Sequence, residues 1–508
     1  MNSRHYSLLI AVLCGLSLAM MPPSARAQTN QQAPSQDQQN QGQTNQAQAP
    51  QGQQNEEQPA APIPAYHSPL ASAAGGDESD QQAQPMTPDT TPLSGAQVLT
   101  LGSVEGNHNY WQPHVDIFES VVSNPEESPN QSGWGTWLSL SGGVDLHRTS
   151  GDSDLMLSYL GGGTFSTDSS VGDGVVQQLG VSDKFTLRRW TLSVLDEVSY
   201  LPGAGFGFGG LGDGGLSTGG SVGVGSTFGL PGQTALTGFG QTLENAATGE
   251  ADVNLTPRTS LTFVAGYSLL QYSRSGLLNS TEANFRGGYN YLLTRKDTIA
   301  ALYTYSALRY SNFNQSIDVH TIQASYGRRV TGRLAFQVAA GPQIAEFRTP
   351  IPGSSGSTTT TTNSSTQFDW SLMANAQYQW QRTNLALSYN HGVSAGAGVL
   401  GGSVADIASG SITREMSHTF SSGLTAGYSR NHGLAIGSTT PLGQNYDYWF
   451  AGASFSHPIG RTLGLTFSYQ MQYQNSSNAF CIGTTCGTSL MTQTISVGLG
   501  WHEKPLLF

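Results

Sequence analysis

The sequence predicts an all-β protein, a transmembrane antiparallel up-and-down β-barrel that follows a disordered N-terminal segment. Long stretches alternate between apolar and polar residues with the period of a strand. Aromatic residues gather at the ends of the apolar faces, and tight polar turns alternate with longer loops. We count about 17 candidate strands, and single-chain bacterial barrels close with even numbers. We therefore expect about 16 strands, or about 18 if the Gly-rich span from Pro202 to Gly232 contains one.

The clearest hairpin runs from Phe368 to Asn390 and turns at Arg382 and Thr383. Every second residue of its first arm is apolar, and Met373 is the one apolar residue on the other face. Trp370 and Tyr378 stand about 20 Å apart in height on a tilted strand, close to the apolar band of a membrane barrel. Strands of a soluble sandwich usually run only about 5 to 6 residues, so the hairpin favours a membrane barrel.

The alternation assigns residues to two surfaces. We expect an aromatic girdle at the membrane interfaces made of Phe368, Trp370, Tyr378, Trp380, Tyr469, Tyr473 and Trp501. We expect the lumen to be lined by Asn375, Gln377, Gln379, Gln381, Thr466, Ser468, Gln470, Gln472, Thr494 and Ser496.

The chain divides into four parts. Residues 1–27 have a basic start, an apolar run and small residues at Ala25 and Ala27, as in a secretory signal peptide. Residues 28–97 are rich in Gln, Asn and Pro, which predicts disorder. Residues 98–132 show no long alternation, and whether they plug or cap the barrel is left open. The barrel is expected over residues 133–508.

Composition agrees with export and membrane insertion. Charged residues make up 11% of the chain, far below the roughly 25% of soluble domains, and glycine accounts for 63 of 508 residues. The net charge of -12 and the lack of a basic stripe argue against nucleic acid as a partner. No metal-ligand spacing appears, and no cofactor is expected.

The connections fall into two classes. Short polar turns are expected at residues 256–258, 294–297, 331–332, 382–383, 430–432 and 460–461. Longer loops are expected at residues 350–367, 393–415 and 474–489. This alternation would place all the long loops at one rim, as in barrels of the outer membrane.

The last strand, from Met491 to Trp501, leads to a chain that ends on Phe508. This ending, with the turn-plus-strand stretches at residues 256–263 and 295–302, resembles bacterial outer-membrane β-barrel proteins of the porin-like kind. Glu503 and Pro505 interrupt the alternation, so the terminal signal is partial. The resemblance implies outer-membrane lipids and the barrel assembly machinery as partners. General porins are often trimers, which gives a mild expectation of a homo-oligomer.

Possible reactive groups are few. Asp318 and His320 are two residues apart on one strand face, but no second acidic pair accompanies them, and we expect no enzyme. His391, His418 and His457 are scattered singly. Cys481 and Cys486 are predicted to form a disulfide in an outer loop, because export passes through an oxidising compartment.

The neutral hydrogen-bonding lumen suggests a function. Strong ion selectivity normally requires rings of charged side chains. The sequence therefore predicts a porin-like channel for passive diffusion of small polar solutes with weak charge selectivity. The alternative is a structural or surface-interaction barrel with a blocked lumen.

Overall fold

The computed structural model describes most of the chain from Pro92 onward. The described residues are 92–96, 109–125, 129, 133–167, 173–202, 240–274, 277–311, 315–331, 333–351, 361–394, 401–417, 419–434, 445–482, 485–504 and 506–507. The predicted signal peptide and almost all of the segment predicted to be disordered lie outside them. So does the Gly-rich span at residues 203–232.

The regular structure of the described residues is entirely β. The strands are β1 (Tyr110–Ser123), β2 (Trp134–Ser150), β3 (Ser153–Ser166), β4 (Gly174–Thr186), β5 (Trp190–Leu201), β6 (Thr242–Thr256), β7 (Thr259–Tyr272), β8 (Ser280–Leu292), β9 (Asp297–Tyr310), β10 (Gln315–Thr331), β11 (Leu334–Ile351), β12 (Thr361–Trp380), β13 (Thr383–Ser394), β14 (Ser403–Ser417), β15 (Phe420–Gly433), β16 (Asn445–Ile459), β17 (Leu463–Ile482), β18 (Thr485–His502) and β19 (Leu506–Leu507). No helix long and apolar enough to cross a membrane occurs among the described residues.

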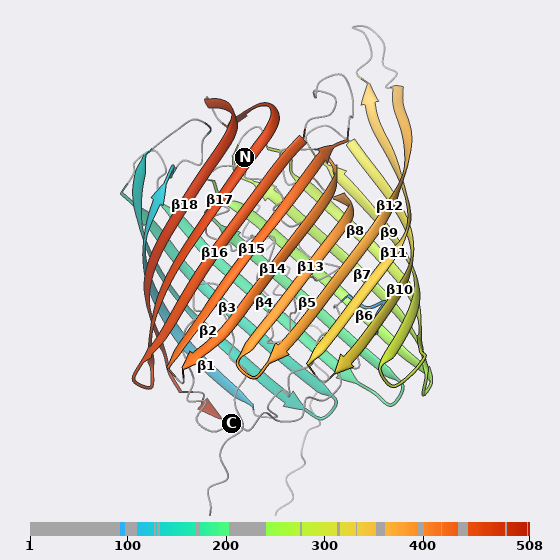
Figure 1. Ribbon diagram of the computed structural model, residues 1–508, viewed down its shortest axis with the longest axis horizontal. Helices are drawn as coiled ribbons and strands as arrows, with labels where there is room; N and C mark the ends of the chain where they lie inside the picture. The colour runs from blue at the N-terminus through green and yellow to red at the C-terminus, as the bar shows by residue number, and fades with distance from the viewer. Residues whose placement is uncertain are drawn as a thin grey trace, which may run out of the picture. The chain divides into compact units, whose positions relative to one another are not determined.

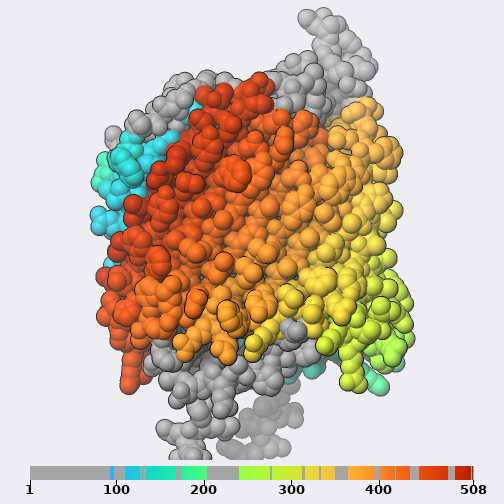
Figure 2. Space-filling model, in the orientation of Figure 1, coloured from blue at the N-terminus to red at the C-terminus, as the bar shows by residue number. Residues whose placement is uncertain are grey.

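Neighbouring strands pair antiparallel in chain order, and the sheet closes on itself where β1 pairs with β18 (Figure 1). The two-residue β19 extends the edge beside the start of β1. The result is a closed 18-stranded up-and-down barrel, as predicted. Its C-terminal strands form a continuous tilted wall (Figure 2).

The first strand corrects the predicted start of the barrel. Strand β1 lies inside the segment 98–132, so that segment supplies barrel wall where a plug or cap was considered, and the barrel begins at Tyr110 instead of residue 133. Pro113 and the charged Asp116 and Glu119 obscure its alternation. The expected number of about 16 strands is wrong and 18 is right, because β1 contributes a strand that lies outside the predicted barrel.

Most of the connections sort by length between the two rims, as expected, but residues 483–484 alone join β17 to β18 at the long-loop rim. Short turns follow the even-numbered strands from β2 to β16, and the chain enters β1 and leaves β18 at the same short-turn rim. Three predicted connections were wrong. Residues 430–432 lie inside β15, and residues 393–415 are mostly strand, because β14 begins at Ser403. Residues 474–489 are also mostly strand, because β17 extends to Ile482 and β18 begins at Thr485. Polar strand residues had been mistaken there for turns and loops.

Candidate functional site

The two faces of the barrel wall differ in character. Side chains alternate between outside and inside along each strand, and paired residues share a face. On β9, β10 and β11 one face carries large exposed apolar residues, such as Tyr303 at 46%, Ile322 at 61% and Val338 at 39% exposure. The opposite face carries buried residues such as Ser325 and Gln337. Apolar side chains left exposed over a closed barrel face lipid, so this is a bacterial outer-membrane barrel with a polar lumen.

The residues expected to line the lumen fall on the inner face. The ladder between β17 and β18 sets Ser468 opposite Ser496 and Gln470 opposite Thr494, and Thr466 and Gln472 lie on the same face. On β12, Asn375 and Gln377 pair with the inner positions of β11, and Gln379 continues that face. Gln381 lies in the turn after β12 and is exposed, so it stands at the mouth instead of on the wall.

The residues expected in the girdle lie on the outer face. Phe368, Trp370, Tyr378 and Trp380 are between 40% and 75% exposed. Tyr378 and Trp380 stand at the short-turn end of β12, whereas Phe368 and Trp370 lie near its middle, because the strand begins at Thr361 and is longer than expected. Trp501 is 37% exposed near the short-turn rim. Tyr469 and Tyr473 are partly covered by neighbours on β16 and β18.

The lumen wall from β1 to β8 carries charges that the sequence reading missed. By strand register, the inward-facing carboxylates there are Asp116, Asp145, Asp154, Glu197, Glu244, Glu250, Asp252 and Glu282. Lys184 and Arg286 are the inward cationic side chains of the same strands. The described inner faces of β15 to β18 are neutral apart from His502. The strands with the plainest alternation have neutral inner faces, whereas charged residues interrupt the alternation of β1 to β8.

Histidines accompany some of these carboxylates. His147 Nε2 lies 2.6 Å from Asp154 Oδ1. His114 lies between two acids, with Nδ1 3.5 Å from Asp145 and Nε2 4.0 Å from Asp116. Within the described residues no three His, Cys, Asp or Glu side chains are arranged to hold a metal ion.

A short segment from before β1 is bound inside the lumen. Residues Pro92–Ala96 lie against the inner faces of β6 to β11, and Leu93, Ser94 and Ala96 are buried. Leu93 packs with Ala300 and Ala335. These residues belong to the segment predicted to be disordered, and no sequence pattern marked them for binding.

An apolar cluster covers the inner wall near the long-loop rim. It consists of Leu308, Tyr310, Ile317, Val319, Ala345 and Phe347, with Leu278, Val393 and Leu434 packed against it. Gly401, in the connection between β13 and β14, accepts a hydrogen bond of 2.7 Å from Gln315 Nε2 on β10. Gly401 therefore lies against the inner wall near this rim.

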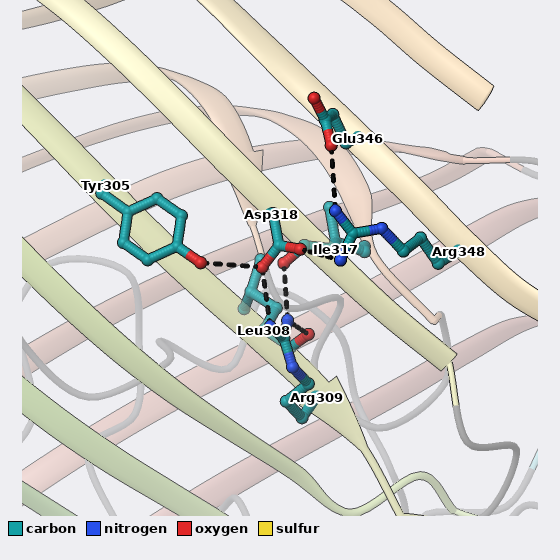
Figure 3. A network of polar contacts seen from close by, with 7 residues as sticks. All are labelled: Tyr305, Leu308, Arg309, Ile317, Asp318, Glu346 and Arg348. Carbon is teal, nitrogen blue, oxygen red and sulfur yellow. Dashed lines mark hydrogen bonds and ion pairs between the residues drawn. The ribbon is translucent and has the colours of Figure 1, made fainter. Parts of the chain in front are cut away.

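Asp318 and His320 have separate partners on the outer face. Asp318 Oδ1 accepts hydrogen bonds from Arg309 Nη2 at 2.7 Å and Tyr305 at 3.1 Å, and Arg348 Nη1 lies 2.9 Å from Asp318 Oδ2 (Figure 3). His320 Nδ1 instead bonds the Tyr303 hydroxyl at 2.8 Å. Both carboxylate oxygens of Asp318 are thus occupied by arginines, an arrangement suited to an ion-pair network at the membrane surface.

The remaining histidines also occupy separate places. His391 stacks on Trp370 at 3.9 Å between ring centres and bonds Asp406 Oδ1 at 2.7 Å. His457 Nδ1 lies 2.7 Å from the carbonyl oxygen of Thr419. His418 lies outside the described residues.

The two cysteines stand opposite each other in the ladder of β17 and β18. Their side chains lie outside the described part of the structure. We predict that the exported protein, denatured without reductant, takes up no iodoacetamide at Cys481 and Cys486, and takes up two equivalents after reduction. A Cys481→Ser variant is the control and should label once in both conditions. Labelling of both thiols in unreduced wild type would refute the disulfide.

Comparison with known proteins yields structural likeness only. No family model matches the chain, and no curated protein matches it. The barrel is similar to Pseudomonas aeruginosa OpdQ, with 10% identity, 78% of this chain and 98% of that chain covered, and a TM-score of 0.37. It is also similar to Acinetobacter baumannii OccAB3, with 9% identity, 78% of this chain and 99% of that chain covered, and a TM-score of 0.36. Pseudomonas aeruginosa OccK2 (OpdF), in complex with glucuronate, has 10% identity, with 79% of this chain and 98% of that chain covered, and a TM-score of 0.38. At these TM-scores the likeness adds nothing to the fold already described.

Proposed function

We propose that this outer-membrane barrel is a passive, porin-like channel for small polar solutes. The observation that supports the proposal is a closed ring of 18 strands whose inner face carries hydrogen-bonding side chains. A ring of this size encloses more space than its own side chains fill. Polar groups on the wall replace part of the water shell of a passing solute, so small hydrophilic molecules are the fitting class.

Charge selectivity is proposed to be weak and to favour cations. Carboxylates outnumber cationic groups on the inner wall of β1 to β8, which attracts cations. These charges occupy one side of the lumen only, and Lys184 and Arg286 offset some of them. The described inner faces of β15 to β18 are neutral apart from His502 and leave room for uncharged solutes.

Reversal potentials in planar bilayers test this proposal. Under a KCl gradient we expect a modest cation preference, and the double variant Glu197→Gln/Glu244→Gln should reduce it because both carboxylates face the lumen. Asp196→Asn is the matched control, since Asp196 adjoins Glu197 on the outer face, where it bonds Asn245. Anion preference, or equal effects of the lumen and outer variants, would refute the assigned selectivity.

A blocked barrel with a structural or surface role is the second candidate. It is favoured by Pro92–Ala96 at one end of the lumen and by the apolar cluster at the other. Absence of any conductance in wild type and in variants without the segment would favour this candidate over a channel.

Partners follow from the same proposal. The exposed apolar face would contact outer-membrane lipids, and insertion would depend on the barrel assembly machinery. The mass of the purified barrel in detergent tests the expected homo-oligomer.

A further inference from the structure

The recess that holds Pro92–Ala96 is the feature of the lumen that simple diffusion does not explain. We propose that this segment is an intramolecular ligand that restricts passage at the short-turn end of the barrel. We further propose that the emptied recess binds the same peptide added in trans. Both statements rest on the proposed channel function.

The recess fits the shape of the segment. A methyl group in place of the hydrogen of Gly288 would overlap the Cβ of Ser94, and one at Gly327 would lie 2.6 Å from Leu93 Cδ2. Both glycines face the lumen, and their missing side chains leave the space that Ser94 and Leu93 fill. Such close approach to a strand backbone is a recognised use of glycine.

Wall side chains bind the segment's main chain in a sequence of specific hydrogen bonds. Gln337 Nε2 donates to the carbonyl of Leu93 at 3.1 Å, and Arg286 Nη1 donates to that of Gly95 at 2.9 Å. The amide of Ala96 donates to Glu250 Oε2 at 2.6 Å.

Ser94 adds a further set of bonds to one wall residue. Its amide donates to Asn290 Oδ1 at 3.1 Å, and its hydroxyl exchanges hydrogen bonds with the Asn290 side chain at 3.0 and 2.8 Å. The segment itself is folded by a hydrogen bond of 3.0 Å from the Gly95 amide to the Pro92 carbonyl. Polar groups of segment and wall thus satisfy each other where both are buried.

The position of the recess explains why occupancy would limit passage. Asn290 and Ala335 each lie within two residues of a strand end at the short-turn rim. Strand β9 is eight strands from β1 in one direction and ten in the other. The bound segment therefore occupies the lumen at this mouth, on the side of the barrel far from β1.

We expect the segment to bind reversibly. Leu93 is the one large apolar side chain of the segment, and ordering a free chain costs conformational entropy at every residue. Glu250, Arg286 and Asn290 all belong to strands that the barrel holds in place without the segment. Release would therefore leave the wall intact and the recess open.

Release is tested by filling the recess. In full-length protein, Gly288→Ala/Gly327→Ala should raise single-channel conductance severalfold. Gly287→Ala is the matched wall control, since Gly287 adjoins Gly288 and a methyl there meets nothing within 4 Å. Leu93→Asp is a second route to release that leaves the barrel wall unchanged. If both release variants conduct like wild type, the segment is no restriction.

Thiol labelling provides a readout that does not depend on conductance. In a Cys481→Ser/Cys486→Ser background, Ser94→Cys should resist a water-soluble maleimide, because Ser94 is fully buried. Adding Gly288→Ala/Gly327→Ala should make it reactive. Reactivity in the unfilled recess would refute the bound segment, whatever the barrel conducts.

A peptide of residues 92–96 tests the empty recess. Added to the Leu93→Asp channel, Pro-Leu-Ser-Gly-Ala should restore the low conductance, and a scrambled peptide should not. Block by both peptides alike would refute specific binding. If no form conducts, the channel proposal fails, and the labelling result then decides on the recess alone.

Discussion

Phe467→Arg will destabilise the membrane-inserted barrel by about 2–4 kcal/mol, the cost of a cation facing the middle of a bilayer. Phe467 is 41% exposed on the outer face and pairs with Phe455 and Val497, which lie on the same apolar surface. Urea titration of protein folded into lipid vesicles, followed by the gel mobility of folded and unfolded forms, measures the change.

The adjacent residue provides the control. Ser468 faces the lumen, so Ser468→Arg leaves the cation in polar surroundings and should cost much less. Equal losses for the two variants would mean that the apolar face does not meet lipid. The membrane topology argued above would then be wrong.

Gly341→Val will lower the free energy of unfolding by about 1–3 kcal/mol or more, the usual effect of overpacking a tight site. A Cβ at Gly341 would overlap the main-chain oxygen of Ile322, and a backbone neighbour cannot move aside as a flexible side chain can. The ladder between β10 and β11 lacks paired residues at Gly341 and Pro342, because proline has no amide to donate. The strands approach closely there, and only glycine fits.

Gly249→Val is the matched control for that variant. Gly249 lies on β6, where an added Cβ meets nothing within 4 Å. The same urea titration should show little change for Gly249→Val. A loss as large as that of Gly341→Val would indicate a general cost of valine in these strands.

Local patterns predicted the architecture well. The hairpin from Phe368 to Asn390 forms with the expected faces, and its turn lies at Gln381 and Arg382, one residue before the predicted turn at Arg382 and Thr383. Alternation identified the two faces of β17 and β18, because each strand there meets lipid on one side and water on the other.

Features that depend on contacts between distant parts of the chain could not be predicted from the sequence. Strand β1 is recognisable only through its partners β2 and β18, since Pro113 and Asp116 disturb its own pattern. The acidic wall results from register, which sets Glu197 and Glu244 on one face from different strands. The binding of Leu93 depends on a space at Gly327 that is more than two hundred residues away in the chain.

The seam between β1 and β18 has a consequence for biogenesis. Asp116 stands opposite Gly500, so the ring joins the earliest and the latest wall segments to be synthesised. Until the final strand emerges, two edges present unpaired amides and carbonyls that hydrocarbon cannot solvate. Closure is therefore an all-or-none event that requires the final strand, and a chain truncated before residue 485 should be degraded in the periplasm instead of persisting as a smaller pore.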